Sequence, residues 1–121
     1  MLCDITPSEL RQIFVLCDRV DDQMHFGAMG YPYSHNAMVR SWPKVINDKN
    51  HIAFCHKTSG IVDGIFLSRL QDNSYFMENY LVAYEIANHA DPNLNHIARS
   101  RIMLAMRNEA EKRMQALGVK S

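Results

Sequence analysis

The strongest constraint on the fold is a segment near the middle of the chain that has the pattern of a β-hairpin. The segment HIAFCHKTSGIVDGIFLSRLQ contains two strand-like runs, from His51 to His56 and from Ile61 to Leu70. Ser59 and Gly60 precede the second run, and such a connection is typical of a tight hairpin turn. Gly64 inside the second run indicates a β-bulge. The chain is therefore expected to have an antiparallel sheet at its centre.

The motif TPSEL marks the start of a helix ahead of this hairpin. Thr6 is a suitable N-cap, Pro7 takes the first helical position and Glu9 completes a capping box. The apolar residues that follow recur at intervals of three and four and share one helix face: Leu10, Ile13, Phe14, Cys17, Val20 and Met24. The glycines, proline and aromatic residues of MHFGAMGYPYS then predict a loop.

Two more helices and two more strands complete the pattern. Ser34 is a suitable N-cap for a second helix, and the spacing from Ile97 to Leu117 predicts a third, with Gly118 as its C-cap. Asn79 to Ala90 has the character of a strand, and Leu2 to Ile5 could form a short one. The predicted order is β-α-α-β-β-β-α in one domain, residues 1–121, of the α+β class.

Composition and charge exclude several classes of protein. Basic and acidic side chains number thirteen each, so no net positive charge favours nucleic acid. No apolar run is long enough to span a bilayer, and no signal-peptide pattern precedes the first helix. The three cysteines lack C-x-x-C spacing and fit buried thiols in a reducing compartment. The six histidines show no zinc-site spacing, so no metal site is predicted.

The element order, the TPSEL helix start and a strand that ends in Asp91-Pro92 ahead of a basic helix resemble the GNAT family of acetyl-CoA-dependent N-acetyltransferases. In that family the segment after the fourth strand commonly reads D-P-x-[YF]-[RQ]-x-x-G-x-[GA]. Its amides and the adjoining helix start hold the coenzyme pyrophosphate, because helix starts attract anions. The resemblance implies an acetyl-CoA site on these residues: Asn95, His96, Ile97, Ala98, Arg99, Ser100 and Arg101.

The chain departs from the family pattern in two respects. Asn95 stands where the family has Arg or Gln, and Ile97 and Ala98 lie where a glycine would let the backbone approach the phosphates. The family also continues beyond this helix with a strand, a helix and a closing hairpin. We therefore expect a GNAT-like mixed or antiparallel sheet that lacks the C-terminal strand-helix-strand part. We also expect the protein to bind coenzyme weakly or not at all.

Glu85 is the candidate catalytic residue on the fourth strand. Strict alternation would place Glu85 and His89 on one face of the sheet, together with Ala83 and Ala87. The resemblance implies that a carboxylate at this place acts as general base on the substrate ammonium. The alternative is a solvated or salt-bridged glutamate and a strand-end histidine, and the sequence favours this structural role.

The basic residues at the start of the last helix allow two interpretations. Arg99 and Arg101 oppose the helix dipole, at a cost of about 0.3 to 1 kcal/mol each when exposed, so a bound anion would compensate them. In that case the basic side chains bind the anion in place of the backbone amides of a glycine-rich turn. Alternatively, nearby carboxylates such as Asp91 and Glu109 supply the compensation.

Within the predicted fourth strand, the segment Leu81 to Ala90 would lie at the edge of the sheet with few charges to protect it. A protein partner or a second copy of the chain is expected to cover it. The sequence narrowly favours a catalytically degenerate acetyltransferase-like domain that acts through protein association. The resemblance makes a tailed-phage origin and a virion-associated structural role plausible, and the protein is expected to be cytoplasmic or virion-associated. The alternative is an active acetyl-CoA-dependent N-acetyltransferase whose cleft a partner chain completes.

Overall fold

The computed structural model describes residues 1–24, 33–73 and 80–119. Four strands, three α-helices and one short 3-10 helix lie in this part of the chain. Their bounds in chain order are β1 Leu2–Asp4, η1 Pro7–Glu9, α1 Leu10–Met24, α2 His35–Val45, β2 His51–Thr58, β3 Ile61–Asp72, β4 Leu81–Ala90 and α3 His96–Ala116. The predicted element order is confirmed, while the predicted loop from Met24 to Ser34 lies mostly outside the described residues.

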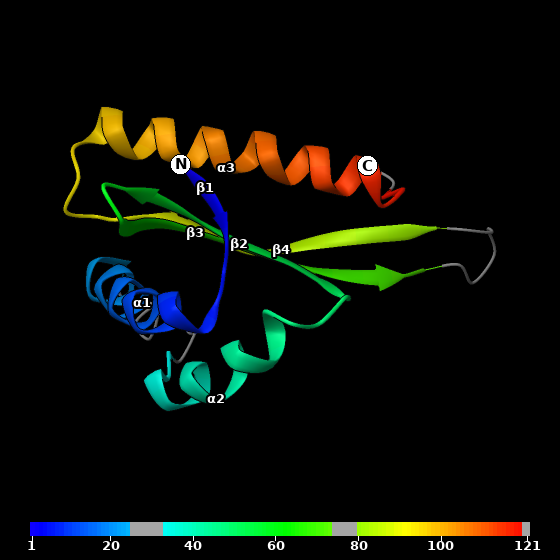
Figure 1. Cartoon of the computed structure of the whole chain (residues 1–121), viewed down its shortest axis with the longest axis horizontal. Coiled ribbons are helices and arrows are strands. Elements are labelled where there is room, and N and C mark those ends of the chain that lie inside the picture. The colour runs from blue at the N-terminus through cyan, green and yellow to red at the C-terminus, as the bar shows by residue number, and fades with distance from the viewer. Residues whose placement is uncertain (25–32, 74–79, 120–121) are drawn as a thin grey trace.

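The strands form one sheet in the order β1-β2-β3-β4, and each neighbouring pair is antiparallel. The helix α3 covers one face of the sheet, and α1 and α2 lie on the other (Figure 1). The predicted α+β class with an antiparallel sheet is therefore confirmed. At the outer side of β4, Val119 forms a single parallel bridge with Leu81.

The hairpin between β2 and β3 forms as predicted. Ser59 and Gly60 have φ angles of 52° and 77°, and two consecutive positive φ values are typical of a type I′ turn, which matches the twist of the strands. The register then passes from Lys57 opposite Val62 to His56 opposite Gly64, so Asp63 is an extra residue. The bulge predicted at Gly64 is thus confirmed beside that glycine.

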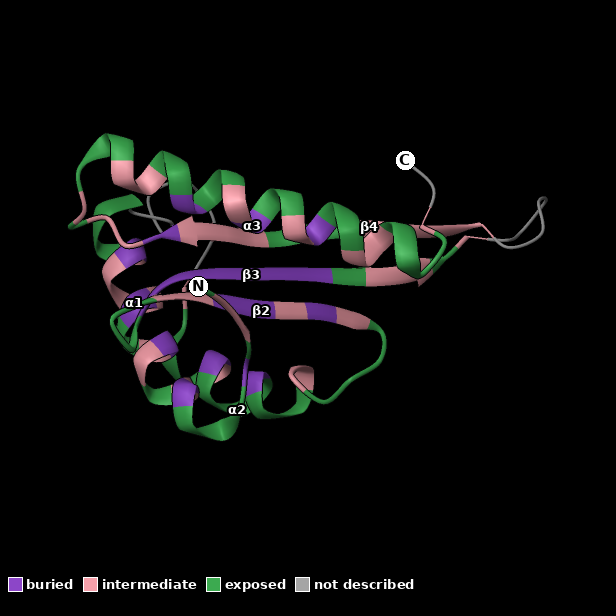
Figure 2. Ribbon diagram, turned by 45° about the horizontal axis from the view of Figure 1, so that its top comes forward, coloured by how far each residue is buried: buried purple, intermediate pink, exposed green. Residues whose placement is uncertain are grey.

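Each face of the sheet carries its own hydrophobic core. Beneath α1 and α2 the core includes Ile13, Leu16 and Ile65. Beneath α3 it includes Phe66 and Met106, and both side chains are almost completely buried. Figure 2 shows the consequence, because most of β3 is buried while α3 is buried only on the side that faces the sheet. The strand β3 is therefore the element that both cores share.

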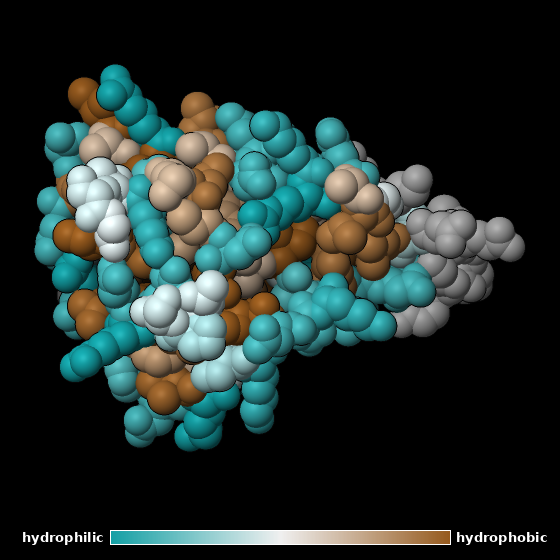
Figure 3. Space-filling model, in the orientation of Figure 1, coloured by the Kyte–Doolittle hydropathy of each residue, from teal (hydrophilic) through white to brown (hydrophobic). Residues whose placement is uncertain are grey.

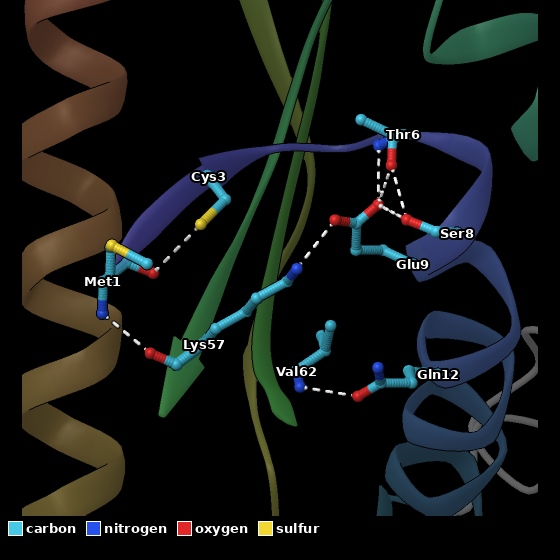
Figure 4. A network of polar contacts seen from close by, with 8 residues as sticks. All are labelled: Met1, Cys3, Thr6, Ser8, Glu9, Gln12, Lys57 and Val62. Atoms are coloured by element: carbon cyan, nitrogen blue, oxygen red, sulfur yellow. Dashed lines mark hydrogen bonds and ion pairs between the residues drawn. The ribbon is translucent and has the colours of Figure 1, made fainter. Parts of the chain in front are cut away.

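A polar network fastens the start of α1 to the hairpin (Figure 4). The carboxylate of Glu9 accepts a hydrogen bond of 2.9 Å from the backbone N–H of Thr6 and one of 2.7 Å from Lys57 Nζ. Gln12 Oε1 accepts a hydrogen bond of 2.8 Å from the backbone N–H of Val62. The reach of Glu9 back to Thr6 is the interaction that the TPSEL motif predicts.

Candidate functional site

The turn between β4 and α3 is held by its own side chains. Asn95 is the N-cap of α3, and its side-chain oxygen accepts a hydrogen bond of 2.8 Å from the backbone N–H of Ala98. Asp91 accepts one of 2.9 Å from the backbone N–H of Asn93. The same Asp91 carboxylate forms a salt bridge of 2.7 Å with Arg19 of α1. Two turn amides that could bind an anion are therefore already paired within the chain.

A hollow of about 500 Å³ lies beside this turn. It is bordered by the end of α1, the last residues of β4 and the first turns of α3, and its lining includes Met24, Asn88, His89, His96, Arg99 and Ser100. Because Asn88 and His89 are neighbours in a strand, they point to opposite faces, so the hollow extends around the outer edge of β4. Its size is in the range of small-molecule sites.

Two buried polar atoms in the residues that line the hollow lack a hydrogen-bond partner within the described part of the chain. They are Asn88 Oδ1 and Arg99 Nε. One is an acceptor and the other a charged donor, and leaving such groups unpaired costs about 1 to 3 kcal/mol each. Groups of this kind are usually paired in folded proteins, so this pair needs an explanation.

The structure divides the predicted cofactor residues into two sets. His96, Arg99 and Ser100 line the hollow. The other four do not line it: Asn95, Ile97, Ala98 and Arg101. Ile97 has 64% of its surface exposed, and Ala98 gives its amide to the cap. Three of the seven predicted residues therefore line a hollow, and their binding of a coenzyme stays a prediction.

The prediction that Glu85 and His89 share a face is wrong. The register passes from Leu67 opposite Ala87 to Ser68 opposite Glu85, which makes Ile86 an extra residue in β4. Ser68 follows Phe66 by two residues and so faces α3, whereas His89 pairs with Ile65 on the face of α1 and α2. A bulge reverses the alternation, and Glu85 thus lies on the α3 side, separated from His89 by the sheet.

A second, smaller hollow of about 220 Å³ lies on the face of α1 and α2. Its lining includes Cys17, Tyr33, Trp42, Leu67, Ala87 and His89. Burial lowers the pKa of His89, and the nearby Glu85 carboxylate opposes this shift. His89 is therefore expected to be neutral at neutral pH.

Sequence reasoning missed Asn88, Met24 and the bulge at Ile86. A bulge without glycine leaves no mark in the pattern, since Ile86 fits a regular strand equally well. Asn88 offered a weak signal, because an amide within an apolar strand is unusual unless it has a partner. Met24 lines the hollow because the end of α1 lies beside the last residues of β4, an arrangement that no local pattern encodes.

Neither a metal centre nor a membrane span is found in the described ranges. Residues 1–24, 33–73 and 80–119 contain no cluster of three or more metal-binding side chains. No helix in these ranges has the length and apolar character that crossing a membrane requires. On the face that Figure 3 draws, hydrophobic residues lie in separate patches among hydrophilic ones.

The sequence matches no protein-family model and no curated protein, but the fold is similar to that of solved acetyltransferases. An aminoglycoside 6'-N-acetyltransferase from Acinetobacter haemolyticus superposes with a TM-score of 0.74 at 8% identity, covering 100% of this chain and 75% of that chain. A GNAT family acetyltransferase from Staphylococcus aureus gives 0.66 at 17% identity, covering 94% and 78%. The acetyltransferase AAC(6')-Iy, solved with a CoA bisubstrate analogue, gives 0.59 at 12% identity, covering 100% and 90%. At these identities the likeness shows the fold alone, and that fold is GNAT-like.

Proposed function

We propose that the chain binds acetyl-CoA in the hollow between β4 and α3 and serves acetyl transfer to an amine. The observation that carries this proposal is the pair of unpartnered buried atoms, Asn88 Oδ1 and Arg99 Nε, in residues that line one hollow. A ligand that carries separate phosphate and amide groups, as coenzyme A does, offers an acceptor to Arg99 and a donor to Asn88. The acetyltransferase-like fold supports the same assignment.

Side chains replace the turn amides in this proposal. The backbone N–H of Ala98 donates to the Asn95 side chain, and that of Asn93 donates to Asp91. The turn therefore has fewer free N–H groups for a diphosphate than a glycine-rich turn would have. Arg99 stands within the first turn of α3, where a cation opposes the helix dipole. A bound diphosphate would compensate both the guanidinium and the dipole.

Acetyl transfer also requires a base, because the acceptor ammonium must lose a proton before its nitrogen can attack the thioester that acetyl-CoA supplies. The family resemblance implied Glu85 for this role, although the sequence favoured a structural role for it. His89 is the better candidate, since it lines both hollows and Glu85 lines neither of them. The lowered pKa of His89 keeps its ring neutral and able to accept a proton. His89→Gln should remove the pH dependence of the rate, whereas Glu85→Gln should leave it nearly unchanged.

Calorimetric titration with acetyl-CoA tests the binding step. Arg99→Ala should weaken binding roughly tenfold or more, since a charged hydrogen bond is worth about 1.5 to 3 kcal/mol. Arg101→Ala is the matched control, because Arg101 has the same charge on the same helix but does not line the hollow. Equal losses in the two variants, or no saturable heat with the unmodified chain, would reject the proposal.

A second candidate function is protein association without catalysis, as in a virion component. It is supported by the outer edge of β4, where Tyr84 and Ile86 are 45% and 56% exposed. The bulge at Ile86 limits this edge, because bulges interrupt regular pairing with a further strand. Size-exclusion chromatography with light scattering tests it, and Ile86→Lys should abolish any self-association that uses this edge.

A further inference from the structure

The second hollow differs in chemistry from the first. It lies between α1, α2 and the inner face of β3 and β4, and the side chains that line it are mainly apolar or aromatic: Val20, Trp42, Ile65, Leu67, Ile86 and Ala87. Val20 and His89 line both hollows, so the two are neighbours around the edge of β4. A molecule held in the first hollow could therefore meet one held in the second.

The polar groups of the second hollow carry no charge near neutral pH. Burial and the neighbouring Asp18 raise the pKa of the Cys17 thiol to about 12. The phenol of Tyr33 donates a hydrogen bond of 2.5 Å to Asp18, and burial raises its pKa further from neutrality. His89 is neutral for the reason given above. No carboxylate belongs to the described lining.

The volume of the second hollow sets the size of its occupant. An apolar cavity of about 150 Å³ is known to bind benzene, so about 220 Å³ is sufficient for a ring or a branched aliphatic group. A polycation would lose its hydration there without gaining a carboxylate partner. Charge and size therefore both favour a small apolar group.

We propose that the second hollow binds the apolar, ring-sized part of the acyl acceptor, which makes the acceptor a small hydrophobic amine. This inference rests on the proposed acetyl transfer, because the acceptor must approach the coenzyme hollow. It separates the chain from the acetyltransferases of similar fold that act on aminoglycosides, which are polyhydroxylated amines.

Fluorescence of Trp42 reports occupancy directly, since Trp42 lines the second hollow and is the single tryptophan of the chain. The unmodified chain is titrated without coenzyme with phenethylamine, with ethanolamine and with kanamycin. Phenethylamine should give a saturable change, and the two polar amines should give none. A saturable response to kanamycin, or none to phenethylamine up to its solubility limit, would overturn the inference.

A pair of variants on β4 distinguishes a specific site from general adsorption. Ala87 lines the second hollow, and Ala83 pairs with Leu70, whose side chain packs on the α3 side of the sheet. Ala87→Leu should fill the hollow and abolish the response to phenethylamine, while Ala83→Leu should preserve it. Equal responses in the two folded variants would contradict the site.

These outcomes are distinct from those of the coenzyme titration. Amine binding with no acetyl-CoA binding would leave the site in place and reject the proposed function. If Ala87→Leu does not fold, amide chemical shifts of the unmodified chain decide the matter. Phenethylamine should then shift the amides of Leu67 and Ala87 but not that of Ala83, and shifts spread evenly over the chain would reject the site.

Discussion

Glu9 is a buried carboxylate that links the start of the first helix to the hairpin. Hydrogen bonding from Lys57, and then from Thr6, lowers its pKa from the ordinary 4.5 to about 2, against the opposing effect of burial. A carboxylate with a lowered pKa stabilises the folded state above its unfolded pKa. That stabilisation is therefore fully present above about pH 4.5 and is lost as the pH falls towards 2.

Glu9→Gln should thus destabilise the protein at neutral pH by about 1 to 3 kcal/mol, because Lys57 loses its charged partner. The deficit should shrink as the pH falls from 4.5 to 2, where the carboxylate itself becomes protonated. Urea unfolding at a series of pH values measures both effects. Glu111→Gln serves as control, since that side chain is 63% exposed and lies 3.8 Å from Arg107. A deficit independent of pH would contradict the assignment.

The three cysteines should differ in reactivity. Burial raises the pKa of Cys17 to about 12 and that of Cys55 to about 11, so neither forms much thiolate at pH 8. Cys3 is partly exposed. In the folded protein one thiol should react quickly with Ellman's reagent, and the other two only after unfolding. Cys3→Ser should remove the fast phase, and its persistence would show that another cysteine is accessible.

At the scale of secondary structure, Gly64 is a residue at which α3 closely approaches β3. A Cβ on this residue would lie 2.7 Å from Ile102 Cγ2 and 3.0 Å from Met106 Sδ. The Cγ2 methyl belongs to a β-branched residue, which strongly prefers one χ1 rotamer in a helix, so moving this methyl requires a disfavoured rotamer or a shift of the helix. Gly64 is therefore expected to fix the distance between β3 and α3.

Gly64→Ala should destabilise the protein by about 1 to 3 kcal/mol through overpacking. Ile102→Leu moves the methyl branch away from Cβ and should restore part of the loss when combined with Gly64→Ala. Thermal or urea unfolding of the two single variants and the double variant gives the free energies of unfolding for a double-mutant cycle. If the double variant loses the sum of the single effects, contact with Ile102 is not the cause.

The sequence predicted secondary structure better than it predicted the site. Capping residues, turn residues and periodic spacing are local signals, and they identified the hairpin, the bulge beside Gly64 and the helix that Ser34 caps. The bulge at Ile86 had no such signal, yet it decides which face Glu85 occupies. The unpaired atoms of Asn88 and Arg99 depend on how α3 packs against β4, which only the folded chain reveals.

At the scale of the whole molecule, two cores share one sheet. Phe54 and Phe66 stack beneath α3 with ring centroids 5.0 Å apart, and Arg113 of α3 lies over the Phe54 ring at 4.6 Å. Arg113 also donates a hydrogen bond of 2.9 Å to Asp4, which ties α3 to the edge strand β1. Because β2 and β3 supply side chains to both cores, loss of either core exposes the strands that support the other.

The two layers should therefore unfold together. Trp42 reports the layer of α1 and α2, whereas α3, which is the longest helix described, dominates circular dichroism at 222 nm. Urea transitions followed by the two signals should coincide. Met106→Ala, at a residue buried beneath α3, should shift both transitions equally, by about 2 to 5 kcal/mol. If Met106→Ala moved the helical signal to lower urea while the Trp42 transition stayed in place, α3 would be an independently melting layer. The sheet would then not couple the two faces.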